Sequence, residues 1–339
     1  MGTNIKDLTY PTEISLDVLR NKTLVVDSFN LFFQFLTSIR GRDGAPLTDS
    51  SGKVTSVLQG LQSRIPKILS YNIKLIFVAD GTPPVLKSQE KARRRAIKET
   101  AQAQYEKARL SGDEEGMKKF ASMSSHLTTE IIEEALILLD AYGCPIIYAP
   151  SEGEAQASFM CSKGDAYAVV SQDFDSLIHG APRIVRNLNL SGKRKLPGKR
   201  AFTTISPELL TLSDVLNRNG IDLDQLIALS MLVGTDYNYG GIKGLGAKKA
   251  LLAVRQHGKN FDALFETVQW NSSFPVSWQE VFSTIKHMPV SSDYSLVWKP
   301  VNIPAIIDLL CVKHDFLKER VESQLAPFQK KQHTLGDFA

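Results

Sequence analysis

Four of the carboxylates within residues 150–177 form two pairs, and the members of each pair are separated by one residue. Glu152 and Glu154 open a stretch of small and apolar residues, and Asp173 and Asp175 close an apolar run typical of a buried strand. Residues two apart in an extended segment project to the same side, so the aspartates can share one site. The glutamates can join it only if Glu152 lies at a helix start, because residues two apart diverge on a helix. This grouping favours cation binding.

Helix capping is a second explanation for part of this stretch. Ser151 can act as an N-cap whose capping box includes Glu154, reaching back to the backbone N–H of the cap. That arrangement explains Glu154 alone. It leaves Glu152 and both aspartates unexplained, so we predict that the whole cluster is functional.

Two further aspartates end apolar runs elsewhere in the chain. Asp27 closes TLVVD and Asp80 closes KLIFVAD, and the segments CPIIYAP and YAVVSQD have the same character. Strands of this kind, alternating with helices, predict an α/β fold with a mostly parallel central sheet flanked by helices. Ligands bind such sheets at the carboxyl ends of the strands. A single aspartate there is often only an N-cap, but Asp27, Asp80 and Asp173 together with the glutamate pair indicate a site.

A long polar insertion runs from Pro84 to Tyr142 and begins with a basic cluster that has almost no acidic partners four residues further on. Most such runs are solvated helix faces, yet this one begins a few residues after Asp80. A basic helix beside an acidic pocket suits an anionic substrate whose phosphates contact both. Gly112 and Gly116 are expected to divide the insertion into two helices. The cluster comprises Lys87, Lys91, Arg93, Arg94, Arg95 and Lys98.

The pattern of residues 221–258 predicts an apolar helix, then a glycine-rich turn, then a basic helix from Ala247. Asp236 lies between the apolar helix and the turn. The turn is no dinucleotide fingerprint, because a helix precedes it and the third glycine is missing. Glycines at a helix N-terminus let backbone N–H groups approach a nucleic-acid phosphate, so we predict a helical hairpin that binds phosphates. A simple interhelical loop is the alternative. The residues concerned are Lys243, Gly244, Gly246, Lys248 and Lys249.

The overall composition is that of a globular chain of 339 residues with 43% hydrophobic residues and a net charge of +4. Such a chain can bury a large core in one domain or two closely joined ones. Its three cysteines lack CxxC or Cys/His spacing, which favours a reducing compartment. No apolar run is long enough for a membrane span, and Lys6 and Asp7 interrupt the stretch that a signal peptide would need. We therefore expect an intracellular protein without a membrane partner.

Five motifs occur in a fixed order along the chain: VVDSFNLFFQFL, VADGTPPVLK, APSEGEAQA, SQDFDSL and GTDYNYGGIKGLGAKKA. In this order the chain resembles the flap endonucleases of the XPG family of structure-specific 5′ nucleases, above all the archaeal members. The resemblance covers nearly the whole sequence. It implies a DNA endonuclease that removes 5′ flaps in replication and repair, with 5′-3′ exonuclease activity, in the cytoplasm of an archaeon.

The resemblance also implies roles for single residues. Lys87 and Arg94 would face the scissile phosphate, and Phe33 stands where related enzymes carry an aromatic that stacks on the next base. DNA contacts are implied for Arg93 and for the hairpin at 234–257, with K⁺ as a candidate ion near residues 234–250. Metal ligation is implied for Asp27, Asp80, Glu152, Glu154, Asp173, Asp175 and Asp236.

Phosphodiester hydrolysis requires acidic and basic side chains of these kinds. Two metal ions about 3.5 to 4 Å apart can activate the attacking water and stabilise the leaving oxygen. Mg²⁺ prefers oxygen ligands and keeps several waters, and Mn²⁺ is a substitute. The seven carboxylates listed above would leave a net charge of −3 against two divalent ions. Cations such as Lys87 and Arg94 are therefore expected to offset the repulsion of the phosphate.

The last residues form a predicted tail, 329–339. Gln332, Leu335 and Phe338 match the motif that binds the sliding clamp (PCNA), but Ala339 stands where a second aromatic is usual. A short helical turn would place Leu335 and Phe338 on one side, suited to a hydrophobic groove. This predicts a weakened clamp contact, and a disordered end without a role is the alternative.

We predict one nuclease domain over residues 1–328 and a monomeric protein. It would comprise an N-terminal region at 1–100, a helical arch at 87–127, an internal region at 128–260 and C-terminal helices at 261–328.

Three alternatives stay open: a sister 5′ exonuclease or junction-resolving nuclease, a PIN-like ribonuclease, and a catalytically dead, clamp-associated DNA-binding scaffold. The long arch and short tail favour a flap endonuclease over a sister exonuclease or resolvase. The hairpin argues against a PIN-like ribonuclease, and the complete set of seven acids argues against a catalytically dead scaffold. The basic segment 191–200 has no assigned role.

Overall fold

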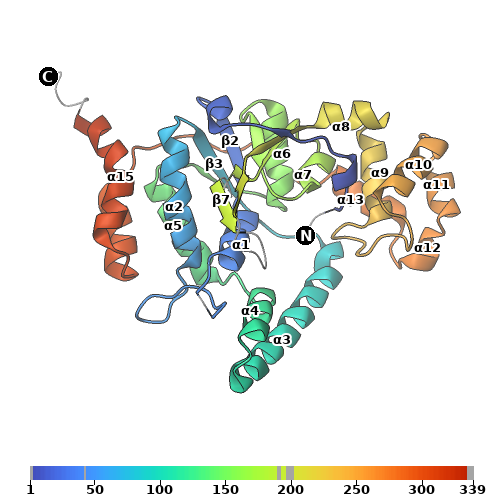
Figure 1. Cartoon of the computed structure of the whole chain (residues 1–339). Coiled ribbons are helices and arrows are strands. Elements are labelled where there is room, and N and C mark those ends of the chain that lie inside the picture. Colours follow the sequence, from blue (N-terminus) through green and yellow to red (C-terminus); the bar gives the residue numbers. More distant parts are fainter. Residues whose placement is uncertain (1–2, 42, 189–191, 196–201, 334–339) are drawn as a thin grey trace.

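A seven-stranded sheet forms the centre of the computed structural model, which describes residues 3–41, 43–188, 192–195 and 202–333 (Figure 1). The strand order is β1-β9-β6-β5-β2-β3-β4, and the five strands from β6 to β4 are parallel. This confirms the mostly parallel sheet. The strands are β1 (Thr12–Glu13), β2 (Thr23–Asp27), β3 (Lys74–Ala79), β4 (Ile146–Tyr148), β5 (Ala168–Val170), β6 (Arg183–Arg186) and β9 (Glu208–Thr211).

The remaining strand pairs depart from the parallel pattern. Strand β9 runs antiparallel to β6, and β1 pairs antiparallel with β9 at the edge of the sheet. A separate antiparallel pair is formed by β7 (Gly192–Lys195) and β8 (Phe202–Ile205). The basic segment 191–200 therefore includes one strand of this pair, and residues 191 and 196–200 lie outside the described part of the chain.

Apolar side chains of the central strands alternate between the two faces of the sheet. In β2, Leu24 and Val26 belong to one hydrophobic cluster and Val25 to the other. In β3 the alternation continues, with Phe77 on the side of Leu24 and Val78 on the side of Val25. Successive residues of a strand point to opposite faces, so near-continuous apolar runs fill two cores at once.

Helices cover both faces of the sheet. The first hydrophobic cluster, which includes Leu24, is completed by helices α1 (Ser28–Ser38), α2 (Ser56–Ser70), α5 (Thr129–Ala141), α14 (Ile303–Ile307) and α15 (Lys318–His333). The second cluster, which includes Val25, is completed by helices α6 (Gly153–Lys163), α7 (Asp175–Ile178), α8 (Leu212–Asn219), α9 (Leu223–Val233), α10 (Ala247–His257), α11 (Phe261–Thr267), α12 (Trp270–Ser273) and α13 (Trp278–Lys286). Short helical segments are η1 (Lys6–Leu8), η2 (Leu16–Leu19), η3 (Val85–Lys87) and η5 (Asp308–Lys313).

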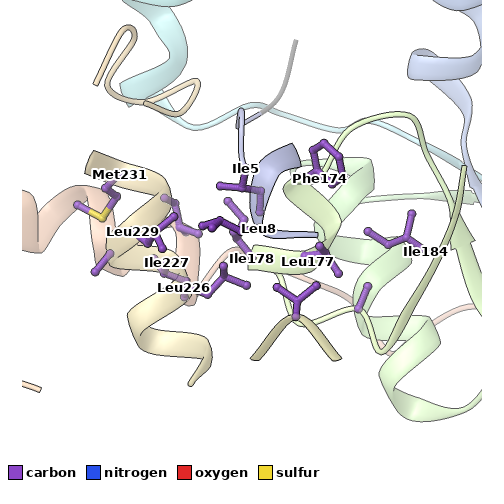
Figure 2. Packing of buried hydrophobic residues seen from close by; sticks show 14 of the residues in the cluster. Ile5, Leu8, Phe174, Leu177, Ile178, Ile184, Leu226, Ile227, Leu229 and Met231 are labelled. Atoms are coloured by element: carbon purple, nitrogen blue, oxygen red, sulfur yellow. The ribbon is translucent and has the colours of Figure 1, made fainter. Parts of the chain in front are cut away.

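The N-terminal segment helps to hold α9 beside the sheet. Figure 2 shows Ile5 and Leu8 between side chains of the segment around α7, such as Leu177, and side chains of α9, such as Ile227. Ile5, Leu177 and Ile227 are at most 1% exposed. This packing fixes the end of α9, and with it the segment that carries Asp236, relative to the strand ends.

Helices α3 (Ser88–Ser111) and α4 (Glu114–Met123) project away from the sheet as a pair (Figure 1). Gly112 ends α3 with a φ of 71°, a left-handed conformation that glycine adopts without strain. Gly116, in contrast, lies inside α4. The predicted break at Gly112 is confirmed, and the one at Gly116 is wrong because Asp113 caps α4 by accepting the backbone N–H of Gly116.

The C-terminal part is helical to its described end. Helix α15 continues to His333, so the structure places residues 329–333 in a helix where the sequence predicted the start of a tail. Gln332 lies in the last turn of this helix, whereas Leu335 and Phe338 lie outside the described residues. Among the helices described, none is long and apolar enough to cross a membrane.

Candidate active site

All seven predicted acids line one cleft of about 620 Å³ at the carboxyl ends of the strands. Asp27 ends β2 and also caps α1, accepting the backbone N–H of Asn30 at 3.1 Å. Asp80 follows β3 directly, and Asp175 is the first residue of α7. Parallel strands deliver their following residues to one edge of the sheet, which brings together acids far apart in the sequence. We call this site the acidic cleft.

The glutamate pair reaches the cleft through the start of α6. Glu152 is the N-cap residue of this helix, which meets the condition for sharing a site with Glu154. Asp80 accepts the backbone N–H of Gly153 at 2.7 Å and so ties the helix start to the end of β3. A Cβ atom at position 153 would lie 2.7 Å from that same Asp80 oxygen, so glycine leaves room for this contact.

The structure excludes the capping alternative for the first pair, and the prediction of an extended segment for the second pair is wrong. Ser151 does not cap α6; its hydroxyl donates to the Thr82 carbonyl at 3.0 Å instead. Asp173 and Asp175 are not in an extended segment, because β5 ends at Val170 and a bend leads directly into α7. Asp173 reaches the cleft from this bend, and Asp175 reaches it from the first residue of α7.

Two cations from the base of the projecting helices contact the acids. Lys87 Nζ lies 2.6 Å from Glu152 Oε1 and 3.1 Å from Asp236 Oδ2. Arg94 Nη2 lies 2.5 Å from Asp236 Oδ1. Burial alone would lower the pKa of Lys87, but attraction to Glu152 and Asp236 outweighs it and raises the pKa above its ordinary value. Both side chains therefore stay cationic inside the cleft.

The buried carboxylates repel one another. Burial and then the charge of Asp80 raise the pKa of Asp27 to about 8, and burial raises the pKa of Asp175 to about 6. The pKa of Glu154 is also well above its usual range, because of burial and then the nearby Asp175. An all-oxygen donor set with this excess of negative charge fits hard divalent cations such as Mg²⁺ or Mn²⁺.

The side chains are not arranged as a closed metal cage. Among the described residues, no three acidic, histidine or cysteine side chains converge closely enough to hold an ion. Glu152 and Asp236 turn toward Lys87 and Arg94, and Asp173 accepts a hydrogen bond from the Asn30 side chain at 2.6 Å. The cleft brings the candidate ligands together, and ion binding would require their carboxylates to rotate.

Sequence reasoning missed three residues of the site. Asn30 contacts both Asp27 and Asp173, and the Tyr237 hydroxyl donates to Glu152 Oε2 at 2.7 Å. Glu90 pairs with two arginines of the basic run that follow it, whereas the prediction considered only acids four residues further on. Only sequence position could have indicated these residues. Asn30 and Tyr237 closely follow an aspartate, and Glu90 lies three and four residues before arginines.

The other wall of the acidic cleft is apolar. Phe33 lies there with 39% of its surface exposed, and Lys98 Nζ is 5.4 Å from the centre of its ring. The remaining apolar lining residues come from α1, α3, the end of α4 and the segment between α4 and α5: Phe29, Ile97, Met123 and Leu127. One side of the cleft is thus suited to charge and the other to a flat apolar group such as a nucleobase.

Asp236 apart, the residues singled out in the predicted hairpin do not line the acidic cleft. Helices α9 and α10 are joined by residues 234–246, and Gly246 is the N-cap residue of α10. Gly244 has a φ of 84°, and a Cβ atom at Gly244 or Gly246 would meet no atom within 4 Å. The space that a side chain would occupy at each of these glycines is therefore open. The side chains of Lys243, Lys248 and Lys249 are exposed around it.

Replacing Asp27 by Asn is expected to stabilise the metal-free protein at pH 8. Asn keeps the cap of α1 but removes a buried charge. An aspartate whose pKa is raised on folding contributes stability below its unfolded pKa near 3.9, and that contribution disappears as the pH rises toward 8. The substitution should raise the melting temperature in EDTA by about 2 °C or more, measured by calorimetry at pH 8. A lower melting temperature there would contradict the assigned repulsion.

Comparisons with known proteins agree with this geometry. Residues 5–101 match the family model of the XPG N-terminal domain, and residues 143–236 match that of the XPG I-region. Flap endonuclease 1 of Staphylothermus marinus is 44% identical over 95% of this chain and 93% of its own length. Flap endonuclease 1 of Pyrococcus abyssi is also 44% identical, over 100% of this chain and 98% of its own.

A solved structure gives the same result for the fold. The flap endonuclease-1 from Methanococcus jannaschii superimposes with a TM-score of 0.74 at 38% identity, covering 96% of this chain and 97% of its own. The resemblance in motif order, the full-length sequence identity and the shared fold point to one family. Nucleases of this family depend on divalent metal ions. The chain therefore belongs to the flap endonucleases, structure-specific 5′ nucleases of the XPG family.

Proposed function

We propose that the chain cuts branched DNA at the base of a 5′ flap by two-metal hydrolysis, with 5′-3′ exonuclease activity, during DNA replication and repair. The observation that supports this mechanism is the acidic cleft, where the carboxylates at the strand ends face Lys87 and Arg94 from the base of the projecting helices. Anionic DNA bound there would meet metal ligands on one side and fixed cations on the other.

The proposed ligands of the metal ions are the seven acids Asp27, Asp80, Glu152, Glu154, Asp173, Asp175 and Asp236. Two Mg²⁺ ions, or Mn²⁺ as a substitute, would supply Lewis-acid chemistry for in-line attack of water on the phosphodiester. The protein's own cations have a separate task. Lys87 and Arg94 offset the negative charge that builds on the phosphate in the transition state, and the buried cleft limits screening of that charge by water.

Substrate binding is proposed to use three surfaces. Phe33 stacks on the base next to the scissile phosphate, and Arg93 adds a cation at the base of the arch. The exposed turn at Gly244 and Gly246 grips the duplex backbone, with Lys243, Lys248 and Lys249 around it. K⁺ bound at residues 234–250 would add positive charge to this third surface.

Replacing Lys248 and Lys249 by Ala should weaken binding to every DNA that contains duplex, independently of sequence. Each phosphate contact that is lost should flatten the dependence of log Kd on log salt by about one unit. Fluorescence anisotropy over a salt series with double-flap, nicked and plain duplex DNA measures both effects. Loss of affinity for one DNA sequence only would contradict binding to the phosphate backbone of the duplex.

The C-terminal tail is proposed to bind the sliding clamp through Gln332, Leu335 and Phe338. Deleting residues 330–339 should leave cleavage of short free flaps unchanged but remove stimulation by the clamp. Ala339→Phe should strengthen clamp binding, because a second aromatic would fill the groove that the motif normally occupies. Calorimetry of the tail peptide with the clamp measures this. No heat at high micromolar concentration, for both the natural peptide and the Phe variant, would mean that the tail has no such role.

The alternative functions are not favoured. A DNA-binding scaffold would have no need for the complete acid set facing Lys87 and Arg94. The identity of 44% over 328 residues is to a flap endonuclease rather than to an exonuclease or a junction-resolving enzyme. Cleavage of matched substrates tests the choice directly: a double flap, a recessed 5′ end and a four-way junction. Preferred cutting of the four-way junction would favour a resolvase, and cutting of the recessed end alone would favour an exonuclease.

A further inference from the structure

Glu90 is a buried acid at the start of the otherwise exposed helix α3, where its side chain is only 3% exposed. Its carboxylate accepts hydrogen bonds from Arg93 Nε at 2.6 Å and Nη2 at 2.8 Å, and from Arg94 Nε at 2.7 Å. Arginines three and four residues further on lie on the same helix face, so one carboxylate can hold both. An acid at this position reduces the positive charge available to bind DNA, so it does not serve DNA affinity. Its contacts indicate that it holds the two arginines in position.

Arg94 spans the distance between Glu90 and the acidic cleft. Its Nε is held by Glu90 while its Nη2 lies 2.5 Å from Asp236. A guanidinium group is planar and rigid, so fixing Nε also fixes the direction of both Nη atoms. Asp236 is a proposed metal ligand, so its contact with Arg94 would change when a metal ion binds. The contact between Glu90 and Arg94 would not depend on the metal ion.

Arg93 connects the same carboxylate to the segment between α9 and α10. Its guanidinium carbon lies 3.6 Å from the centre of the Tyr239 ring, close enough for a stacked cation–π contact. Tyr239 belongs to residues 234–246, the segment that carries Asp236 and leads to the exposed glycine turn. Through Arg93, Glu90 joins the base of the projecting helices to this segment.

We propose that Glu90 is a positioning residue: it directs Arg94 into the acidic cleft and, through Arg93 and Tyr239, docks the base of α3 on residues 234–246. This inference rests on the proposed function, because it requires that Arg94 acts on the scissile phosphate. Its consequence is that Glu90 affects the rate of cleavage without contacting DNA.

Glu90→Gln tests the inference, because it keeps the side-chain shape and removes the charge. Glu99→Gln is the matched control, since Glu99 pairs with Arg95 at 2.8 Å on the exposed part of the same helix. Single-turnover cleavage of saturating double-flap DNA with Mg²⁺ should fall about tenfold or more for Glu90→Gln, with Kd changed less than about twofold. Glu99→Gln should cleave like the natural protein. Tyr239→Leu, at an exposed position, should lower the rate about threefold.

A double-mutant cycle distinguishes positioning from general support of the fold. If the rest of the effect of Glu90 passes through Arg94, adding Glu90→Gln to Arg94→Ala should lower the rate further by no more than the about threefold expected from docking through Arg93 and Tyr239. Rate losses that multiply in the double variant, a loss confined to Kd, or an unchanged rate for Glu90→Gln would each overturn the inference, and an unchanged rate for Tyr239→Leu would overturn its docking part. If Arg94→Ala itself leaves the rate unchanged, the proposed role of Arg94 fails and this inference with it. Glu90→Asp, which keeps the charge and shortens the reach, replaces Glu90→Gln in the cycle if that variant does not fold.

Discussion

Asp173→Ala and Asp175→Ala should each abolish cleavage while leaving DNA affinity within about twofold of the natural value. Both carboxylates lie in the acidic cleft, where they are proposed to hold metal, whereas affinity for DNA comes mainly from phosphate contacts elsewhere. Single-turnover cleavage of double-flap DNA and anisotropy with the same DNA measure the two quantities.

Asp165→Ala is the matched control for this experiment. Asp165 is an acid of the same region that contacts Tyr294 and Lys163 instead of the acidic cleft. Its replacement should change neither rate nor affinity. Full activity of the Asp173 or Asp175 variant would remove the basis for the proposed metal site.

Lys87→Ala and Arg94→Ala should each lower the single-turnover rate by on the order of 10² or more with little change in Kd. Both cations lie within about 3 Å of the carboxylates that face the substrate, and burial strengthens their interaction with a developing negative charge. A residue that acts on the transition state changes the rate, whereas an ordinary phosphate contact changes affinity. Quench-flow kinetics with saturating enzyme separates these outcomes.

Lys299→Ala controls for the loss of one positive charge. Lys299 is exposed and pairs with Asp140 at 2.8 Å, outside the acidic cleft. It should leave the cleavage rate unchanged. If the effect of Lys87→Ala or Arg94→Ala is confined to Kd, these residues are phosphate contacts without a role in the chemical step.

The parallel strands and the acids at their ends could be predicted from the sequence. TLVVD and KLIFVAD are buried on both faces, and this burial requires nearly continuous apolar residues followed by a polar residue at the sheet edge. The start of α6 at Glu152 was anticipated as a condition for a shared site. These features depend on local patterns that a sequence displays directly.

Features set by competition between partners could not be predicted in the same way. Ser151 has the residue type of an N-cap, but the carbonyl of Thr82 takes its hydroxyl and Asp80 takes the N–H of Gly153. Strands β6 and β9 are only four residues long each, so neither showed a clear apolar pattern. The link from Arg93 to Tyr239 joins residues 146 positions apart, which only the folded chain brings together.

Cleavage of a labelled double-flap DNA by the purified protein, with Mg²⁺ and with EDTA, tests the central claim most directly. A 3′ label on the strand with the 5′ flap reports the position of the cut, and a 5′ label on the same strand reports whether the flap leaves as one piece. The proposed function predicts release of an intact flap by a cut near its base with Mg²⁺ and no cut in EDTA. Equal cleavage in EDTA, or binding of the DNA without any cleavage in Mg²⁺ or Mn²⁺, would contradict it.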